Sequence, residues 1–136
     1  MPGSPDATAA ARRWADTWRR AWEAQDTEAI VELYHPDVVF STQPFREPSL
    51  RRAGVREYVS QAFSEEEEVR AWVGNPVVGD DRAAVEWWAA LRENGVEITL
   101  AGTSVLRFDA DGLVIEQRDV WNQAEGRREP PEGWGR

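Results

Sequence analysis

The stretch Leu113 to Gln123, L-V-I-E-Q-R-D-V-W-N-Q, is the most informative part of the chain for its fold. Its alternation of apolar and polar residues is typical of a strand, in which successive side chains point to opposite faces of a sheet. One face would carry Leu113, Ile115, Gln117, Asp119 and Trp121. Burying a polar group without a partner costs roughly 2–7 kcal/mol, so an amide and a carboxylate are unexpected on a core face. We therefore expect this face to line a cavity.

Upstream of this stretch, the sequence predicts three helices and then an antiparallel sheet. Helical spacing of apolar residues indicates a helix from about Asp6 to Gln25, a second ending at His35 before Pro36, and a third over residues 54–63. A strand is expected over residues 38–42. The remaining strands are expected over residues 69–78, 83–92, 96–108 and 113–123, joined by turns rich in Asn, Asp and Gly. This order predicts an α+β fold, with a curled sheet whose one face carries the helices.

The length and composition favour one small acidic domain. The 136 residues predict a single domain over residues 1–123, followed by an irregular tail over residues 124–136 that Trp134 could anchor. The net charge of −9 disfavours nucleic acid and anionic membranes as partners. The N-terminal residues M-P-G-S-P-D show no signal-peptide pattern, and no run is apolar enough to span a membrane, so we expect a cytoplasmic protein.

Several kinds of site are excluded by residue usage. The chain has no cysteine, which removes thiolate metal sites and cysteine nucleophiles. His35 is its only histidine, so a site with several histidine ligands is excluded, and the turn from Asp109 to Gly112 lacks the later ligands of a calcium loop. Glu65 to Glu68 is interpreted as a solvated entry to a strand, because consecutive strand residues cannot converge on one ion. We expect no metal and no cofactor.

Three segments of the chain form a recognisable set. They are W-x-x-A-W-E-A-Q-D-T-E-A-I-V-E-L-Y-H-P-D-V-V-F near the start, A-G-V-R-E-Y in the third predicted helix, and G-T-S-V-L-R-F-D-A-D-G-L-V-I-E-Q-R-D-V-W-N near the end. In these segments the chain resembles the nuclear transport factor 2-like superfamily, which includes the SnoaL-like polyketide cyclases and the ketosteroid isomerases. The resemblance implies a cone-shaped, cystatin-like α+β roll with three helices packed in a strongly curved antiparallel sheet. It also implies a homodimer.

The resemblance transfers one functional residue. The positions of the ketosteroid isomerase tyrosine and two aspartates correspond to Trp18, Thr42 and Ser104 here, so that catalytic set is not kept. Limonene-type epoxide hydrolases share the Arg118-Asp119 pair but need an Arg and an Asp where this chain has Trp87 and Ala89. The acid/base aspartate on the last strand of SnoaL-like cyclases corresponds to Asp119.

Asp119 is therefore the candidate catalytic residue, because a carboxylate desolvated by aromatic walls can exchange protons near neutral pH. The alternative is a structural Asp119 paired with an arginine or an amide. We predict a small apolar or aromatic ligand in the cone. The predicted substrate-binding residues are Trp18, Thr42, Tyr58, Trp87, Ser104, Gln117 and Trp121.

The function predicted from these residues is that of a cofactor-independent isomerase, cyclase or lyase acting on an apolar cyclic carbonyl compound. Two alternatives are a non-catalytic ligand-binding or dimeric interaction module and an epoxide hydrolase-like enzyme. Trp88 should project from the outer face of the sheet, and an exposed aromatic patch there favours a homodimer through that face.

Overall fold

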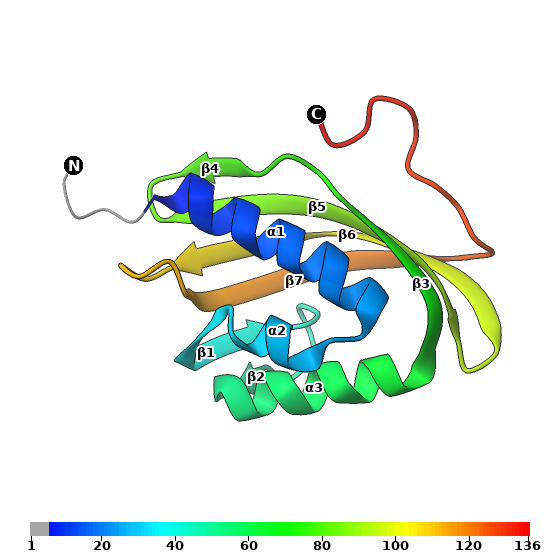
Figure 1. Cartoon of the computed structure of the whole chain (residues 1–136), viewed down its shortest axis with the longest axis horizontal. Helices are drawn as coiled ribbons and strands as arrows, with labels where there is room; N and C mark the ends of the chain where they lie inside the picture. Colours follow the sequence, from blue (N-terminus) through cyan, green and yellow to red (C-terminus); the bar gives the residue numbers. More distant parts are fainter. Residues whose placement is uncertain (1–5) are drawn as a thin grey trace.

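The structure is a computed structural model that describes residues 6–136. Residues 1–5 lie outside the described part. They include the start of the predicted domain and most of the segment M-P-G-S-P-D, which shows no signal-peptide pattern. The elements follow one another along the chain as shown in Figure 1. They are α1 (Ala7–Ala24), α2 (Thr27–Val31), β1 (Tyr34–Ser41), β2 (Ser49–Leu50), α3 (Arg51–Glu65), β3 (Glu66–Val73), β4 (Val77–Gly79), β5 (Arg82–Glu93), β6 (Val96–Phe108) and β7 (Val114–Glu125).

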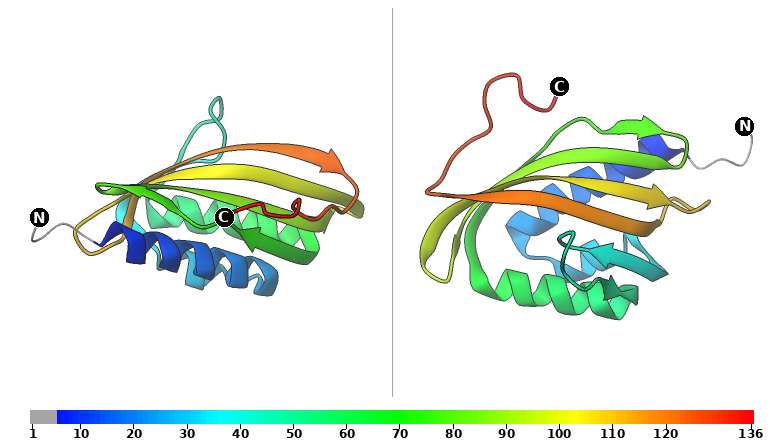
Figure 2. Two further views of the ribbon diagram at one scale, coloured as in Figure 1. Left: turned by 90° about the horizontal axis from the view of Figure 1, so that it is seen from above. Right: turned by 180° about the vertical axis from the view of Figure 1, so that it is seen from behind.

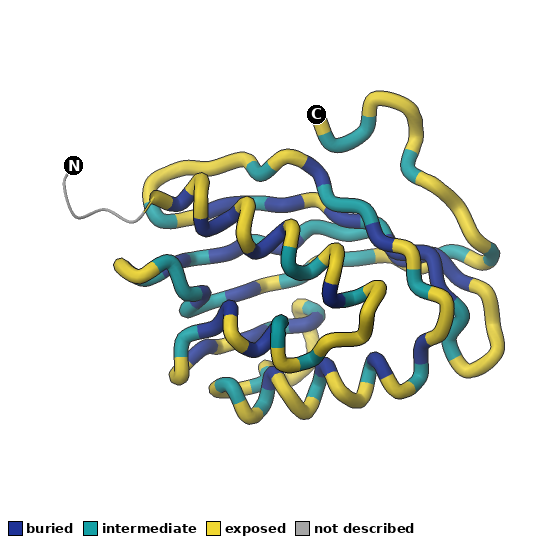
Figure 3. The backbone as a smooth tube through the Cα atoms, viewed as in Figure 1, coloured by how far each residue is buried: buried dark blue, intermediate teal, exposed yellow. Residues whose placement is uncertain are grey.

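The predicted α+β roll is confirmed, with three helices on one face of a curved seven-stranded sheet (Figure 2). The strand order is β2-β1-β7-β6-β5-β3, and β4 pairs with β5. The sheet is mixed rather than wholly antiparallel, because β1 runs parallel to β7. Figure 3 shows that buried residues concentrate where the sheet and the helices face one another.

Helix α1 begins and ends where its capping residues predict. The Asp6 carboxylate accepts a hydrogen bond from the Ala9 amide at 3.1 Å, and Gln25 closes the helix in a left-handed conformation. Trp14, Trp18 and Trp22 lie four residues apart on one face, with successive ring centroids 6.1 and 5.7 Å apart. The aromatic face of α1 therefore points toward the sheet.

The second helix is shorter than predicted. It ends at Val31 rather than at His35, and β1 already begins at Tyr34. Pro36 has no amide proton to donate, and it lies in β1 where the pairing register with β7 is interrupted, between Tyr34 and Val39. Burial of Tyr34 against β7 overrides the local helical pattern.

The strand predicted over residues 69–78 is two strands. Strand β3 starts directly after α3 at Glu66 and ends at Val73, while β4 is a separate short strand beyond Pro76. Proline cannot donate to a central ladder, which explains the break.

A β-bulge shifts one end of β7 relative to the predicted alternation. Phe108 pairs with Val114 but Arg107 pairs with Glu116, so Ile115 is the additional residue. Val114 is consequently buried, whereas Leu113 and Ile115, which were predicted on the core face, are only half-buried. Beyond the bulge the predicted alternation holds.

Gly102 allows β5 and β7 to approach closely on either side of β6. A Cβ atom at this position would lie 2.5 Å from the Val120 carbonyl oxygen and 2.6 Å from the Trp121 Cβ. The close approach expected from a glycine inside this strand is therefore present.

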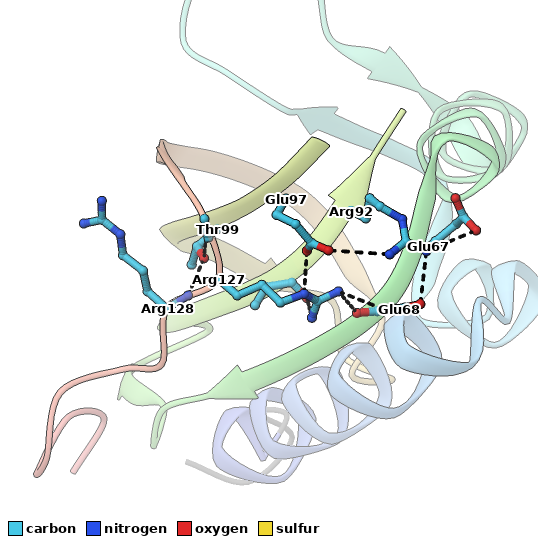
Figure 4. A network of polar contacts seen from close by, with 9 residues as sticks. Glu67, Glu68, Arg92, Glu97, Thr99, Arg127 and Arg128 are labelled. Carbon is cyan, nitrogen blue, oxygen red and sulfur yellow. Dashed lines mark hydrogen bonds and ion pairs between the residues drawn. The ribbon is translucent and has the colours of Figure 1, made fainter. Parts of the chain in front are cut away.

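The segment after β7 folds back against the sheet (Figure 4). Arg127 donates to Glu97 Oε2 at 2.6 Å, and Thr99 bonds both the Gly126 carbonyl and the Arg128 amide. The Trp134 ring packs against Trp88 with centroids 6.4 Å apart. Trp88 is thus half-buried beneath the tail, on the face away from the helices.

Candidate functional site

A cavity of about 440 Å³ lies between the aromatic face of α1, helix α3 and the inner face of the sheet. This volume is within the usual range for small-molecule sites. Its wall is mostly apolar and carries indole rings from both the helix and the sheet, together with a few polar groups. The tryptophans therefore line the interior without filling it.

Asp119 lies on this wall at the centre of β7, opposite Ser104 of β6. Its Oδ1 accepts hydrogen bonds from the Ser104 hydroxyl at 2.6 Å and from the Gln117 amide at 3.0 Å. Within residues 6–136, its second oxygen has no hydrogen-bond partner. One oxygen is thus held in place while the other is available to a ligand.

Burial raises the pKa of Asp119 to about 7, against the opposing effect of the hydrogen bonds from Ser104 and Gln117. A carboxyl group with this pKa is present in both protonation states at neutral pH. It can therefore act either as a proton donor or as a proton acceptor.

Gln117 is held by a buried network that sets the direction of its amide. Its Oε1 accepts hydrogen bonds from the Tyr34 hydroxyl at 2.5 Å and from Trp14 Nε1 at 3.1 Å. Both donors approach the carbonyl end, so the NH₂ end must face Asp119. The Trp18 indole donates in turn to the Tyr34 hydroxyl at 3.0 Å. Desolvation raises the pKa of Tyr34, which stays a neutral donor.

Ser104 connects Asp119 to a second indole. Trp87 Nε1 donates to the Ser104 hydroxyl oxygen at 2.9 Å, and that hydroxyl donates to Asp119. Since the hydroxyl has a single proton, Ser104 is committed to holding Asp119. It cannot donate to a ligand at the same time.

The structure brings together all the predicted site residues except Thr42. The residues that line the cavity with Asp119 are Trp18, Tyr58, Trp87, Ser104, Gln117 and Trp121. Thr42 is buried behind the wall, where its carbonyl accepts a hydrogen bond from Trp121 Nε1 at 2.7 Å. Its hydroxyl lies near that of Tyr58 without meeting hydrogen-bond geometry to any described residue.

Glu66 is a cavity residue that the sequence analysis missed. The interpretation of Glu65 to Glu68 as a solvated strand entry is wrong at this position, because Glu66 is only 6% exposed and lines the cavity. Burial raises the pKa of Glu66 to about 7. Strand β3 begins at Glu66 directly after α3, which directs this side chain inward, and no signal within a run of four glutamates distinguishes it from its neighbours.

Across residues 6–136, no group of His, Asp and Glu side chains has the arrangement needed to hold a metal ion. His35 accepts a hydrogen bond from the Asp37 amide, and Asp109 accepts two from its own turn. None of the helices described is both long and apolar enough to cross a membrane.

One comparison with known proteins shows the family, and another supports the fold. The family model described as the SnoaL-like domain matches residues 11–117. No functionally curated protein matches the chain. Among solved structures, the chain is similar to SalBIII, described as an epoxide hydrolase/cyclase-like enzyme with a role in pyran ring formation in the polyether salinomycin. The TM-score is 0.77 at 20% identity, over 88% of this chain and 98% of that one.

A second similar structure is that of Rv0760c from Mycobacterium tuberculosis. The TM-score is 0.74 at 16% identity, over 90% of this chain and 98% of that one. Likeness at these identities supports the fold alone, whereas the family model spans most of the chain. The chain therefore belongs to the SnoaL-like domain family.

Proposed function

We propose that this protein binds a small apolar cyclic carbonyl compound in the cavity and uses Asp119 as a general acid/base to isomerise or cyclise it, or to cleave a bond by elimination. The observation that carries the proposal is the unequal environment of the two Asp119 oxygens. Ser104 and Gln117 hold Oδ1, while the other oxygen has no partner among the described residues. Such a carboxyl group is positioned to exchange a proton with a bound molecule.

The proposed chemistry is proton transfer next to a carbonyl group. The Asp119 carboxylate removes a proton from the carbon α to the carbonyl, and the electron pair of that C–H bond moves toward the carbonyl oxygen. In an isomerisation, the protonated Asp119 then returns the proton at another carbon. The enzyme therefore ends in its starting protonation state, and no cofactor is required.

Tyr58 is the proposed hydrogen-bond donor to the carbonyl oxygen. Its side chain lines the same cavity from α3, whereas the nearby Ser104 hydroxyl is already committed to Asp119. Burial, followed by the charge of Asp119, raises the pKa of Tyr58, so the phenol keeps its proton. A neutral phenol can stabilise negative charge that develops on the substrate oxygen.

The test measures proton transfer without requiring a known product. A panel of cyclic ketones would first be screened for binding by native mass spectrometry, and deuterium incorporation from D₂O at the α-carbon would then be followed by NMR. We expect Asp119→Asn to bind the same ketones but to exchange their α-protons at least about 100-fold more slowly, which is the lower end of typical general acid/base contributions. Unchanged exchange in this variant would exclude the proposal.

Two alternatives are distinguished by the same panel. A non-catalytic binding module would bind ketones with no exchange above background in the wild-type protein. An epoxide hydrolase-like enzyme would convert epoxides in the panel to diols. The similarity to SalBIII makes epoxides a necessary part of the panel.

A homodimer through the outer face of the sheet belongs to the same proposal. The segment between β1 and β2 projects on this side (Figure 2), with Phe45 fully exposed and Val120 53% exposed near Trp88. Exposed apolar side chains around a half-buried tryptophan favour a partner surface. Light scattering that shows only monomers at 50 μM would exclude this dimer. The cytoplasmic location is likewise a proposal, which cell fractionation would test.

A further inference from the structure

Glu66 is a buried carboxyl group with one oxygen open to the cavity. It lies at the start of β3, and its Oε1 accepts a hydrogen bond from Trp22 Nε1 at 2.8 Å. Its other oxygen has no partner among the described residues, and no arginine of residues 6–136 forms an ion pair with it. The proposed proton transfer at Asp119 makes no use of this group.

Glu66 and Asp119 line the same cavity but are held through different tryptophans of α1. Trp14 bonds Gln117, the neighbour of Asp119 on the inner face, whereas Trp22 bonds Glu66. These two tryptophans are eight residues apart on α1, which corresponds to about 12 Å at a rise of 1.5 Å per residue. The two carboxyl groups therefore have separate hydrogen-bond anchors along α1.

The wall around Glu66 is aromatic. The Trp22 ring lies edge-on to Trp18 and to Trp87, at centroid distances of 5.7 and 5.6 Å. Trp72 also lines the cavity, from the strand that Glu66 begins. Indole faces attract cations, and this attraction strengthens when the cation is removed from water.

The charges around this end are mainly negative. After burial, the charges of Glu93 and Glu65 also raise the pKa of Glu66, while the hydrogen bond from Trp22 lowers it. Arg19 is the positively charged residue of α1 that lines the cavity, and its guanidinium nitrogen lies 3.8 Å from a carboxylate oxygen of Glu23. The charged and titratable groups that line the cavity with Glu66 are Arg19 from α1, Tyr58 and Glu65 from α3, Glu93 from β5, Asp119 from β7 and Arg46 from the segment after β1.

We infer that the Glu66 end of the cavity is a subsite for a protonated amine, so that the ligand is an apolar body carrying an ammonium group. An ammonium would pair with the open oxygen of Glu66 and lie against the indole rings. A hydroxyl group would donate a hydrogen bond to the same oxygen but would bring no positive charge. A carboxylate would be repelled by the negative charge of Glu66. The inference rests on the proposed function only in placing the ligand in the same cavity.

The Asp119 end is less suited to an ammonium. Its carboxyl group already receives two neutral donors, whereas that of Glu66 receives one, from Trp22. The amine should therefore select Glu66. This leaves Asp119 free for the carbonyl part of the same molecule.

The test compares three indoles of nearly equal shape by isothermal titration calorimetry at pH 8.0 and pH 5.5. Tryptamine carries an ammonium group, tryptophol a hydroxyl and indole-3-acetate a carboxylate. At pH 8.0 we expect tryptamine to bind roughly tenfold more tightly than tryptophol, because the hydrogen bond is charge-assisted, and indole-3-acetate to bind most weakly. The advantage should shrink at pH 5.5, where Glu66 is protonated and tryptamine keeps its charge.

Three variants locate the amine. Glu66→Gln should abolish the preference for tryptamine over tryptophol. Glu67→Gln, a matched change at the exposed neighbour that pairs with Arg92, should keep the preference, and so should Asp119→Asn. If Glu66→Gln does not fold, the pH dependence measured in Asp119→Asn tests the same subsite, because Glu66 is then the remaining one of the two carboxyl groups with a pKa of about 7.

Four results would overturn the inference. They are equal affinity for tryptamine and tryptophol at pH 8.0, a preference that survives Glu66→Gln, a preference lost in Asp119→Asn, and no binding of tryptamine at millimolar concentration. Deuterium exchange is measured separately. A Glu66-dependent amine preference without any effect of Asp119 on exchange would contradict the proposed function and leave this subsite standing.

Discussion

Replacing Asp119 with asparagine should stabilise the protein at alkaline pH. The amide is close in shape to the carboxyl group, and its carbonyl oxygen can still accept hydrogen bonds from Ser104 and Gln117. What the variant loses is a negative charge held in a cavity with aromatic walls. In the wild-type protein, ionisation of Asp119 places this charge in the cavity and lowers the free energy of unfolding.

The size of the effect follows from the pKa of Asp119. Burial raises it from an ordinary 3.8 to about 7, so the folded protein binds more protons at this site than the unfolded chain does between these two pH values. The free energy of unfolding therefore falls as the pH rises through this window. At 1.36 kcal/mol for each pH unit, Asp119 should cost the wild-type protein about 4 kcal/mol above pH 7 relative to pH 4.

Urea denaturation of both proteins at half-unit steps from pH 4 to pH 8.5 measures this difference. The free energies of unfolding should be similar near pH 4, where both side chains are neutral in the folded protein, and the variant should gain about 4 kcal/mol by pH 8. Asp16→Asn provides the matched control, because it removes an exposed carboxylate from the outside of α1. A difference between variant and wild type that does not change with pH would refute a desolvated Asp119.

Three further changes test other parts of the structure. Relative to the wild-type protein, Glu66→Gln should gain about 3 kcal/mol in free energy of unfolding between pH 4 and pH 8, because burial raises the pKa of Glu66 from 4.5 to about 7. A difference between variant and wild type that is the same at both pH values would contradict the burial of Glu66. Gly102→Ala should destabilise the fold by roughly 1–3 kcal/mol in urea denaturation, because its Cβ would meet backbone at 2.5 Å, whereas Gly79→Ala meets nothing within 4 Å; equal effects would count against the close approach. Tyr58→Phe should slow deuterium exchange of bound ketones without weakening their binding more than about threefold, and a pure loss of affinity would argue against a role in the proton transfer.

Much of the fold could be predicted because local patterns and tertiary packing agree. The tryptophan spacing on α1 matches its buried face, and the turns with Asn, Asp and Gly join antiparallel strands at the expected places. On β7 the alternation places Gln117, Asp119 and Trp121 on the cavity wall. In these segments the period of the apolar residues is sufficient to assign the faces.

The features that could not be predicted depend on partners far away in the sequence. The bulge at Ile115 arises from pairing with β6, and the early start of β1 arises from burial of Tyr34 against β7. The parallel pairing of β1 with β7 is equally invisible to a local pattern. Glu66 points inward because β3 begins directly after α3 ends, and its neighbours Glu67 and Glu68 remain exposed.

The hydrogen bonds around Asp119 also required the structure. Gln117 and Ser104 are predicted from the sequence as ligand contacts, yet both donate to Asp119 and so position it. Trp14 and Tyr34, which hold Gln117, showed only the pattern of core residues. Packing across the sheet, and not spacing along the chain, decides which buried polar groups form hydrogen bonds with one another.

The proton-exchanging state of Asp119 can be measured directly by NMR titration of its ¹³C-labelled side-chain carboxyl group, with Asp119→Asn used to assign the resonance. The structure predicts a midpoint near pH 7 in the ligand-free protein. A midpoint near pH 4 would show that the carboxyl group is solvated, and Asp119 would then have no environment suited to acid/base chemistry in this cavity.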